Sequence, residues 1–481
     1  MQNDTLDLST SDFKILLEKS TQLVLQQFKQ LDQQKAYHAH EQAAVQGWFD
    51  EPLPQEGMNA LELLDETEEK ILKTATGNLG PHMYAYVMAG GTQISIVAEQ
   101  LAATINQNVG KWHLAPAISE IEKRVVRWSA ELLDLDDFHS GVLVSGGSAA
   151  NLAGLQVARN VFFEKLGIRQ KGLFGQKPFI VYASKEVHGC VDKSLDTLGI
   201  GTNNLRKIAT NEDFTINLVA LEQQIEQDKA KHLQPFCIVG NAGTVNTGAV
   251  DDFVALSKIA KKHGLWLHLD GAYGGLAAAA PSAKGKYAGM HLADSIATDF
   301  HKWLYQPFEV GCLLVKDWAT LRRTYFKPAD YLDTSFEQQG RLDFNEHYFQ
   351  LSRNAKALKV WMTYKAYGAR RIVDMIQKDI DLAQYLANQV EATPDFELVA
   401  RSPLAIACFR YVGNLKEEQQ IIELNQALIP ALEQDGRVFI TGTKLNGVFV
   451  LRACLINHRK TEATTDYLLT VIREVAQQLQ S

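Results

Sequence analysis

The sequence is poor in cysteine. It has five in 481 residues, and Cys190, Cys237, Cys312, Cys408 and Cys454 are scattered without a CxxC pair. This pattern excludes a disulfide framework or a zinc site built on paired cysteines, and it is typical of reduced thiols buried as small apolar side chains. We therefore expect a cytoplasmic protein without a metal centre.

Long apolar runs and an excess of positive charge are also lacking. No stretch reaches the roughly 18 apolar residues that a membrane-spanning helix needs. The opening residues, MQNDTLDLSTSDF, lack the basic start and apolar core of a signal peptide. The 48 Lys and Arg against 56 Asp and Glu give a net charge of −8. These absences argue against a membrane or a nucleic acid as the main partner.

What the sequence does contain, between about residues 140 and 315, is an alternation of short β-rich runs with helical stretches. The runs are GVLVSGG, PFIVYAS, FCIVGNAGT, LWLHLDG, DSIAT and GCLLVKD, and the helical stretches between them include 149–167, 186–199, 216–230 and 252–263. Strands that alternate with helices predict a largely parallel sheet covered on both faces, so we expect an α/β fold.

The remainder of the chain has a different character. Residues 11–33 have the apolar spacing of an amphipathic helix, and another helix is expected near 58–75. Two more helices are expected within 90–134, and a long helical run over 356–392 leads to an α+β end. We predict three parts: a helical N-terminal dimerisation segment over 1–90, a large α/β domain over 91–355, and a smaller α+β domain over 356–481.

Polar and glycine residues follow the predicted strands, where open α/β sheets bind their ligands. They are Ser145-Gly146-Gly147-Ser148-Ala149, His188, Gly243-Thr244, Asp270 and Lys302. Each has an ordinary explanation when it is taken alone: a tight turn for the glycines, a helix cap for Asp270, a satisfied core histidine for His188, and a surface-reaching lysine for Lys302.

Taken together, these residues describe one ligand. Pyridoxal phosphate needs a lysine for a Schiff base, a carboxylate beside its pyridine nitrogen, an anion cradle and a flat group against its ring. Lys302 would hold the aldehyde, Asp270 would keep the ring nitrogen protonated, His188 would stack on the ring, and Ala272 would allow packing on the other face. The phosphate would lie at the helix start at Gly147, Ser148 and Ala149, with Thr244 nearby.

The order SGGSAAN, His188, GTVNTGA, HLDGAYGG and ATDFHKWL closely resembles the group II pyridoxal phosphate-dependent amino-acid decarboxylases of fold type I. These include the aromatic-L-amino-acid, glutamate and diaminobutyrate decarboxylases. The resemblance runs from about residue 75 into the C-terminal domain. It implies a mostly parallel sheet of the seven-stranded type, the roles given above for His188, Asp270 and Lys302, and a place for His301 at the cofactor.

The resemblance also implies an obligate homodimer with the active site at the subunit interface. The helix at 11–33 suits the segment that wraps the partner in such dimers, although it would suit any docked helix. The stretch NVGKWHLAP, which contains Trp112, resembles the stretch that family members contribute to the neighbouring active site.

The sequence departs from the family at two places. In the family a loop supplies a tyrosine that protonates the substrate carbon, and the corresponding position within 327–353 is Phe344. Phenylalanine there is associated in relatives with formation of an aldehyde instead of an amine. Tyr331 or Tyr348 is the alternative proton donor. The second departure is Asp299, followed by Phe300, where many members have Asn-Pro, and we do not assign Asp299 to the phosphate.

The substrate is the least determined feature. In PHMYAYVMAGG, Tyr86 stands where glutamate decarboxylases use a glutamine, which argues against glutamate. Tyr86 and Trp112 would suit an aromatic or extended side chain, whereas Lys111 and His113 could meet an acidic one. Arg452 is either an anchor for a carboxylate or a structural ion-pair residue. We therefore expect decarboxylation of a small-molecule L-amino acid to an amine and carbon dioxide, with an aldehyde synthase as the alternative and a non-catalytic binding protein as a distant one.

Overall fold

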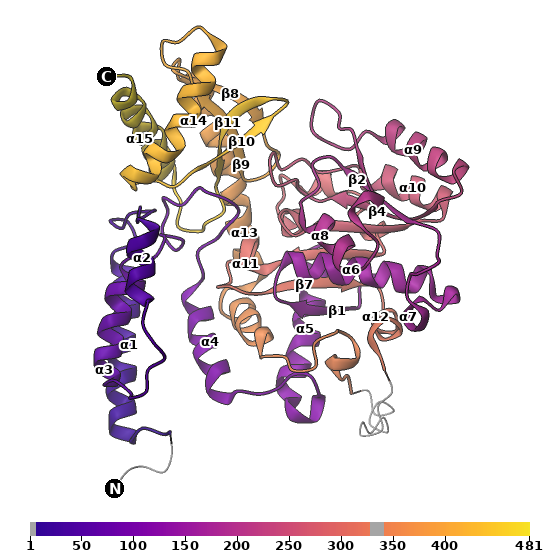
Figure 1. Ribbon diagram of the computed structural model, residues 1–481, viewed down its shortest axis with the longest axis horizontal. Helices are drawn as coiled ribbons and strands as arrows, with labels where there is room; N and C mark the ends of the chain where they lie inside the picture. Colours follow the sequence, from indigo (N-terminus) through magenta and orange to yellow (C-terminus); the bar gives the residue numbers. More distant parts are fainter. Residues whose placement is uncertain (1–5, 328–340) are drawn as a thin grey trace.

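The computed structural model describes residues 6–327 and 341–481, which fold around two β-sheets (Figure 1). The larger sheet has seven strands in the order β1-β7-β6-β5-β4-β2-β3. Strand β7 pairs antiparallel with both neighbours, and the other strands run parallel to one another. The strands are β1 Ser140–Val144, β2 Phe179–Ser184, β3 Leu205–Ile208, β4 Gln234–Asn241, β5 Trp266–Gly271, β6 Ser295–Asp299 and β7 Gly311–Val315. The predicted fold class is confirmed.

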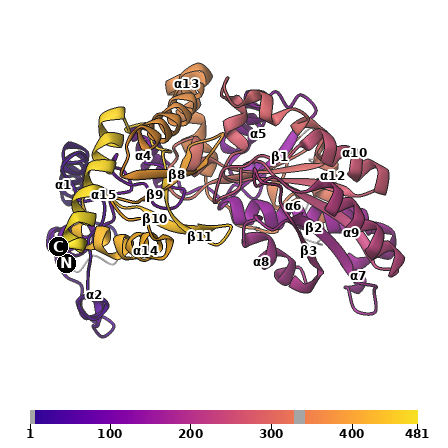
Figure 2. The ribbon, with the colours of Figure 1, turned by 90° about the horizontal axis from the view of Figure 1, so that it is seen from above.

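Helices cover both faces of this sheet, as the apolar strands require. Every residue of β1, β2, β6 and β7 is buried, so neither face of these strands meets water. Figure 2 shows α5 and α10 on one side and α6 and α8 on the other. The helices of this half of the molecule are α5 Pro116–Leu132, α6 Gly147–Phe162, α7 Ile168–Lys171, α8 Cys190–Thr197, α9 Leu218–Ala230, α10 Phe253–His263, α11 Phe300–Trp303 and α12 Trp318–Tyr325.

The second sheet is antiparallel and four-stranded, in the order β10-β11-β9-β8. Helix α13, Lys356–Ala392, packs against α4, Gln93–Ile105, and also against strands of this sheet, so it links the two halves of the molecule. The other elements here are β8 Phe396–Arg401, β9 Ile406–Tyr411, α14 Glu418–Asp435, β10 Thr441–Leu445, β11 Val448–Cys454 and α15 Glu462–Gln480. A boundary near residue 355 separates the two sheets and stays our proposal.

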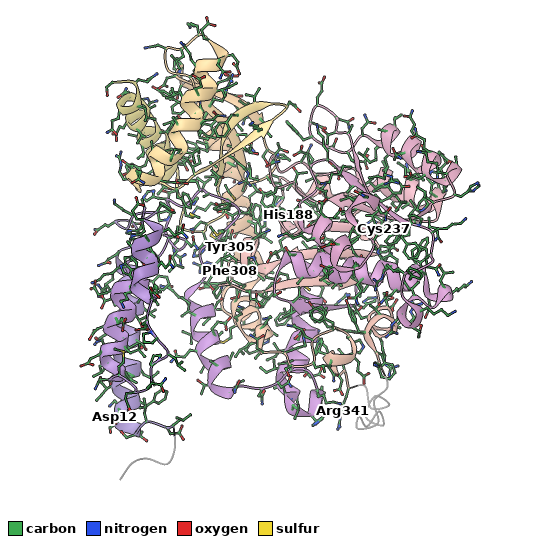
Figure 3. The ribbon with its side chains drawn as sticks, in the orientation of Figure 1. Asp12, His188, Cys237, Tyr305, Phe308 and Arg341 are labelled. Carbon is green, nitrogen blue, oxygen red and sulfur yellow. The ribbon has the colours of Figure 1, made fainter. Side chains whose placement is uncertain are left out.

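The N-terminal helices stand beside this body. Helix α1, Thr10–Lys29, has no buried residue and lies along α3, Ala60–Thr67, as Figure 1 shows. Figure 3 places Asp12 at the far end of α1, well away from His188 near the centre. A short helix α2, Gln42–Phe49, lies between α1 and α3 in the chain, and a π-helical turn, Glu68–Leu72, extends α3. The helices predicted at 11–33 and 58–75 are confirmed.

No helix in the described part of the chain is long and apolar enough to cross a membrane.

A buried ion pair fixes the end of β1. Arg353 donates from Nη1 to Oε2 of Glu122 at 3.1 Å and from Nη2 to the carbonyl oxygen of Leu143 at 2.8 Å. Oε1 of Glu122 accepts from the backbone N–H of Leu143 at 3.0 Å. Both side chains are buried. Helix α5, strand β1 and the segment before α13 are therefore joined two residues before the turn that follows β1.

Glu122→Gln is expected to lower the free energy of unfolding by about 3–5 kcal/mol, because it leaves the guanidinium of Arg353 buried without a counter-charge. The matched control is Glu131→Gln on the same helix, whose exposed pair with Arg127 should contribute less than ~1 kcal/mol. Urea unfolding followed by circular dichroism measures both. Equal midpoints for the two variants would contradict this account of the buried pair.

Candidate active site

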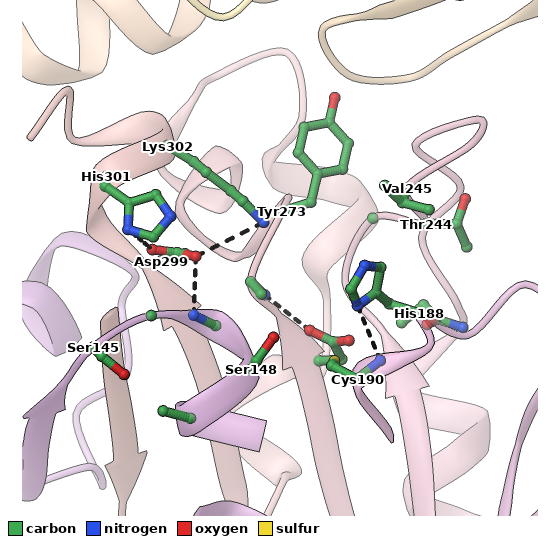
Figure 4. A pocket seen from close by; sticks show the side chains of 17 residues that line it. Ser145, Ser148, His188, Cys190, Thr244, Val245, Tyr273, Asp299, His301 and Lys302 are labelled. Carbon is green, nitrogen blue, oxygen red and sulfur yellow. Dashed lines mark hydrogen bonds and ion pairs between the residues drawn. The ribbon is translucent and has the colours of Figure 1, made fainter. Parts of the chain in front are cut away.

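A cavity of about 330 Å³ opens at the carboxyl ends of the parallel strands (Figure 4). The turn after β1, the loop after β4, the end of β5 and the end of β6 all reach it, because parallel strands direct their carboxyl ends to the same edge of a sheet. All the residues predicted to bind a cofactor line it: Gly147, Ser148, Ala149, His188, Thr244, Asp270, Ala272, His301 and Lys302.

The start of α6 is pressed against the loop that follows β5. A Cβ atom added at Gly147 would lie 2.4 Å from Cβ of Ala272, so only glycine allows this approach. The first turn of a helix has N–H groups without intrahelical acceptors, and those of Ser148 and Ala149 belong to this turn. The turn therefore offers hydrogen-bond donors and a positive helix end to an anion in the cavity.

Asp299 already takes one of these donors. Its Oδ2 accepts from the backbone N–H of Gly147 at 2.9 Å and lies 3.8 Å from Nζ of Lys302. Its Oδ1 lies 2.9 Å from Nδ1 of His301 without hydrogen-bond geometry, and it has no hydrogen-bond partner among the described residues. The side chain is 3% exposed. The carboxylate thus accepts a hydrogen bond from the helix start and lies in ion-pair range of the amine of Lys302.

Asp270 ends the central strand β5, where it is buried. Its Oδ1 accepts from Nδ2 of Asn151 at 3.0 Å and from the backbone N–H of Ala272 at 3.1 Å. Both of these donors bind one oxygen, so Oδ2 is available to a donor in the cavity. The two hydrogen bonds fix the orientation of the carboxylate.

Lys302 and His188 enter the cavity from different elements, α11 and the turn before α8 (Figure 4). Nδ1 of His188 accepts from the backbone N–H of Cys190 at 3.2 Å, which places the imidazole proton on Nε2. Burial raises the pKa of the Cys190 thiol, so this cavity-lining cysteine is a neutral side chain. The cavity therefore combines an amine, an imidazole, a carboxylate and an anion cradle.

Arg452 on β11 lies beside the cavity and is 4% exposed. Its Nε donates to the carbonyl oxygen of Val245, a cavity-lining residue, and its Nη1 to that of Tyr86, both at 2.9 Å. Its Nη2 is buried without a hydrogen-bond partner in the described part of the molecule. Among the described residues, the hydrogen-bond partners of Arg452 are carbonyl oxygens, and its role stays a prediction.

Among the described residues, the other predicted substrate and loop residues do not line this cavity. Tyr86 is 59% exposed, and its ring lies 6.1 Å from that of Phe439. Trp112 donates from Nε1 to Glu120 at 2.9 Å. Phe344 is fully buried in a 3₁₀ turn, with the guanidinium of Arg353 4.7 Å from its ring centre.

Of the two alternative proton donors, Tyr348 is also buried, which raises its pKa to about 12, and it does not line the cavity. Tyr331 lies outside the described residues.

Four cavity-lining residues were not singled out from the sequence: Cys190, Asn241, Val245 and Tyr273. A fifth missed residue, Asn151, touches Asp270 without lining the cavity. Its position one helical turn after Gly147 was the available signal, since residues four apart share one face of a helix.

Comparisons with known proteins agree on a single family. The family model described as "Pyridoxal-dependent decarboxylase conserved domain" matches residues 43–412. The chain is 31% identical over 483 residues to an aromatic-L-amino-acid decarboxylase of Bacillus atrophaeus, covering 99% of this chain and 98% of the relative. It is 30% identical over 410 residues to a phenylacetaldehyde synthase of Arabidopsis thaliana, covering 83% and 82%.

Among solved structures, the chain resembles Oryza sativa TDC, which was crystallised with PLP and tryptamine. The TM-score is 0.93, the sequence identity is 23%, and the match covers 99% of this chain and 100% of that one. At this identity the likeness shows the fold, including both sheets.

Asp299→Asn is expected to raise the affinity of the cavity for inorganic phosphate by about tenfold, because it removes a buried negative charge beside the helix start. The matched control is Asp252→Asn, which changes the exposed cap of α10. Isothermal titration of the cofactor-free protein with phosphate measures both. An unchanged or lower affinity in Asp299→Asn would show that the carboxylate does not oppose anion binding.

Proposed function

The chain belongs to the pyridoxal-dependent decarboxylase family, and we propose that it converts an L-amino acid with an aromatic or otherwise extended side chain to the corresponding amine and carbon dioxide. Pyridoxal phosphate-dependent decarboxylation of an amino acid is the reaction of this family. The observation that carries the proposal for this chain is the meeting of Lys302, Asp270, His188 and the start of α6 in one cavity.

The residues present fit pyridoxal phosphate. Gly147, Ser148 and Ala149 at the start of α6 line the cavity, where the N–H groups of a first helical turn can donate to a phosphate, and Oδ2 of Asp270 is available to the N–H of a pyridinium ring. When bound, the cofactor supplies a protonated ring that accepts the electrons of the bond between the α-carbon and the carboxylate. Thr244 lines the same cavity, and its hydroxyl accepts from the backbone N–H of Ala249 at 3.1 Å. This bond holds Thr244 where it would contact the phosphate.

Each side chain then has a distinct task. Lys302 would bind the cofactor's aldehyde covalently, and Oδ2 of Asp299 lies 3.8 Å from its amine. Asp270 would accept from the ring N–H, and its burial would strengthen that ion pair. His188, held by the backbone N–H of Cys190, would pack on one ring face and Ala272 on the other, and His301 would contact the cofactor.

Arg452 is our candidate for the substrate carboxylate. Two of its nitrogens are fixed on carbonyl oxygens, which orients the third, and a buried guanidinium nitrogen without a partner favours an anionic ligand. Tyr86 provides the carbonyl oxygen for one of these bonds, so its segment lies next to the same region. Exposed Tyr86 and the partly buried Trp112 suit an aromatic side chain better than glutamate.

We further propose a homodimer with the active site at the subunit interface. Helix α1 buries none of its residues within one chain, and Phe13, Ile15, Val24 and Leu25 on it are exposed apolar side chains. Such a surface is favourable only when another surface covers it. In this arrangement the partner supplies the stretch that carries Trp112. The buried free thiols are in keeping with a cytoplasmic location.

An aldehyde synthase is the second candidate, and Phe344 is the observation that favours it. Amine formation consumes one proton and releases carbon dioxide. Aldehyde formation combines the amino acid with O₂ and water and releases the aldehyde, carbon dioxide, ammonia and hydrogen peroxide. A phenylalanine cannot donate a proton to the α-carbon, so at this position it removes the group that favours the amine.

Lys302→Ala is expected to lower the decarboxylation rate by at least about 1000-fold, because it removes the only group proposed to bind the aldehyde covalently. Borohydride reduction of the holoenzyme followed by peptide mass spectrometry should place the cofactor on Lys302. The control Lys193→Ala changes an exposed lysine on α8 and should keep the label. A wild-type protein that takes up no label would support the non-catalytic alternative, and a label on another lysine would contradict the assignment.

With a panel of L-amino acids, we expect an aromatic substrate to give amine and carbon dioxide in equal amounts, without hydrogen peroxide. Measuring amine, aldehyde, carbon dioxide and peroxide together, with and without O₂, decides between the two candidates. Aldehyde and peroxide in equal amounts would establish the second one. In that case Phe344→Tyr should shift the products toward amine, whereas Phe349→Tyr, at a nearby exposed phenylalanine, should not.

A further inference from the structure

A chain of hydrogen bonds runs through the sheet to Asp270. Nε1 of Trp266 donates to Oγ of Ser295 at 2.9 Å, and Oγ of Ser295 lies 2.8 Å from Nδ1 of His268. Nε2 of His268 lies 2.9 Å from Oδ1 of Asn151, whose Nδ2 donates to Asp270 at 3.0 Å. The chain crosses from β5 to β6, returns to β5 at His268, and reaches Asp270 through Asn151 on α6. His268 and Asp270 share one face of β5 because they are two residues apart.

The direction of every bond follows from the amide of Asn151. Its Nδ2 donates to the carbonyl oxygen of Gly147 and to Asp270, both at 3.0 Å, and a longer contact of 3.6 Å reaches Sγ of Cys190. The amide oxygen must therefore face His268, which must donate from Nε2. Nδ1 is then the acceptor of the Ser295 hydroxyl proton. Burial lowers the pKa of His268 to about 4, so this imidazole is neutral at ordinary pH.

The packing of α6 prevents the imidazole from leaving this chain. A Cβ atom added at Gly154 would lie 2.4 Å from Cε1 and 2.8 Å from Nδ1 of His268. Glycine at this position lets the helix contact the ring directly, so the ring cannot rotate without moving α6. Asn151 is held on the same helix by its bond to Gly147. The two groups that connect to Asp270 are thus fixed before any ligand binds.

We propose that Asn151 and His268 are positioning residues that hold the carboxylate of Asp270 oriented toward the cofactor's ring nitrogen. The inference rests on the proposed role of Asp270. All four hydrogen bonds donate in the same direction, toward the carboxylate, and each polarises the next. The chain ends on Oδ1, which fixes the plane of the carboxylate and directs Oδ2 to the cavity. Because His268 is neutral, it donates to Asn151 without placing a second positive charge near Asp270, where it would compete with the ring nitrogen for the carboxylate.

The test compares equilibrium binding of pyridoxal phosphate with that of its analogue in which C–H replaces the ring nitrogen. Wild-type protein should bind pyridoxal phosphate at least about 10-fold tighter, which corresponds to about 1.4 kcal/mol. In Asn151→Leu and His268→Phe this ratio should fall below about threefold. His268→Gln keeps an amide N–H toward Asn151 and should restore most of it. Ser295→Ala is a smaller change that tests the same chain if His268→Phe does not fold. It should lower the ratio at least twofold.

The matched control is Tyr182→Phe, which removes a buried hydrogen bond to Asp228 from strand β2 of the same sheet. It should leave the ratio unchanged. A merely structural role for Asn151 and His268 would weaken both ligands equally and keep the wild-type ratio, and that result would overturn the proposal. If the wild-type protein itself binds both ligands equally, it is the proposed role of Asp270 that fails.

Discussion

The site depends on two buried carboxylates that are stabilised by one helix. Asp270 and Asp299 end the adjacent strands β5 and β6, where burial opposes their charge. Helix α6 supplies donors to both, through the side chain of Asn151 and the backbone N–H of Gly147. The glycines at 147 and 154 let α6 approach closely enough to do so. The same helix start faces the phosphate site, so one element sets the charges at both ends of the proposed cofactor.

The second sheet is coupled to this site through Arg452. Its guanidinium joins Val245, in the loop after β4, to Tyr86, in the segment that enters from the N-terminal side. That segment is itself attached to the small sheet, because the backbone N–H of Tyr84 donates to Phe439 at 2.7 Å and Cys454 donates to Tyr84 at 2.9 Å. A substrate carboxylate bound to Arg452 would therefore be positioned by the small sheet, while the cofactor is positioned by the large one.

The sequence predicted the large sheet and the cofactor-side residues well, because buried parallel strands are continuous apolar runs and the site follows their ends. Strands β3, β8 and β10 were missed: LRKI, FELVAR and TGTKL carry charges and are only partly buried, so they lack that signal. The link from His268 through Asn151 to Asp270 was missed, because Asn151 lies on a helix 117 residues from His268 and 119 residues from Asp270. The surroundings of Trp112 depend on a partner subunit in our account, which no pattern in one chain specifies.

A crystal structure of the holoenzyme tests the central claim most directly. Our account predicts continuous density from Nζ of Lys302 to the cofactor, Oδ2 of Asp270 within hydrogen-bond distance of the ring nitrogen, and the phosphate at the N–H groups of Ser148 and Ala149. A cofactor bound with its ring nitrogen away from Asp270, or with its phosphate away from the start of α6, would contradict it.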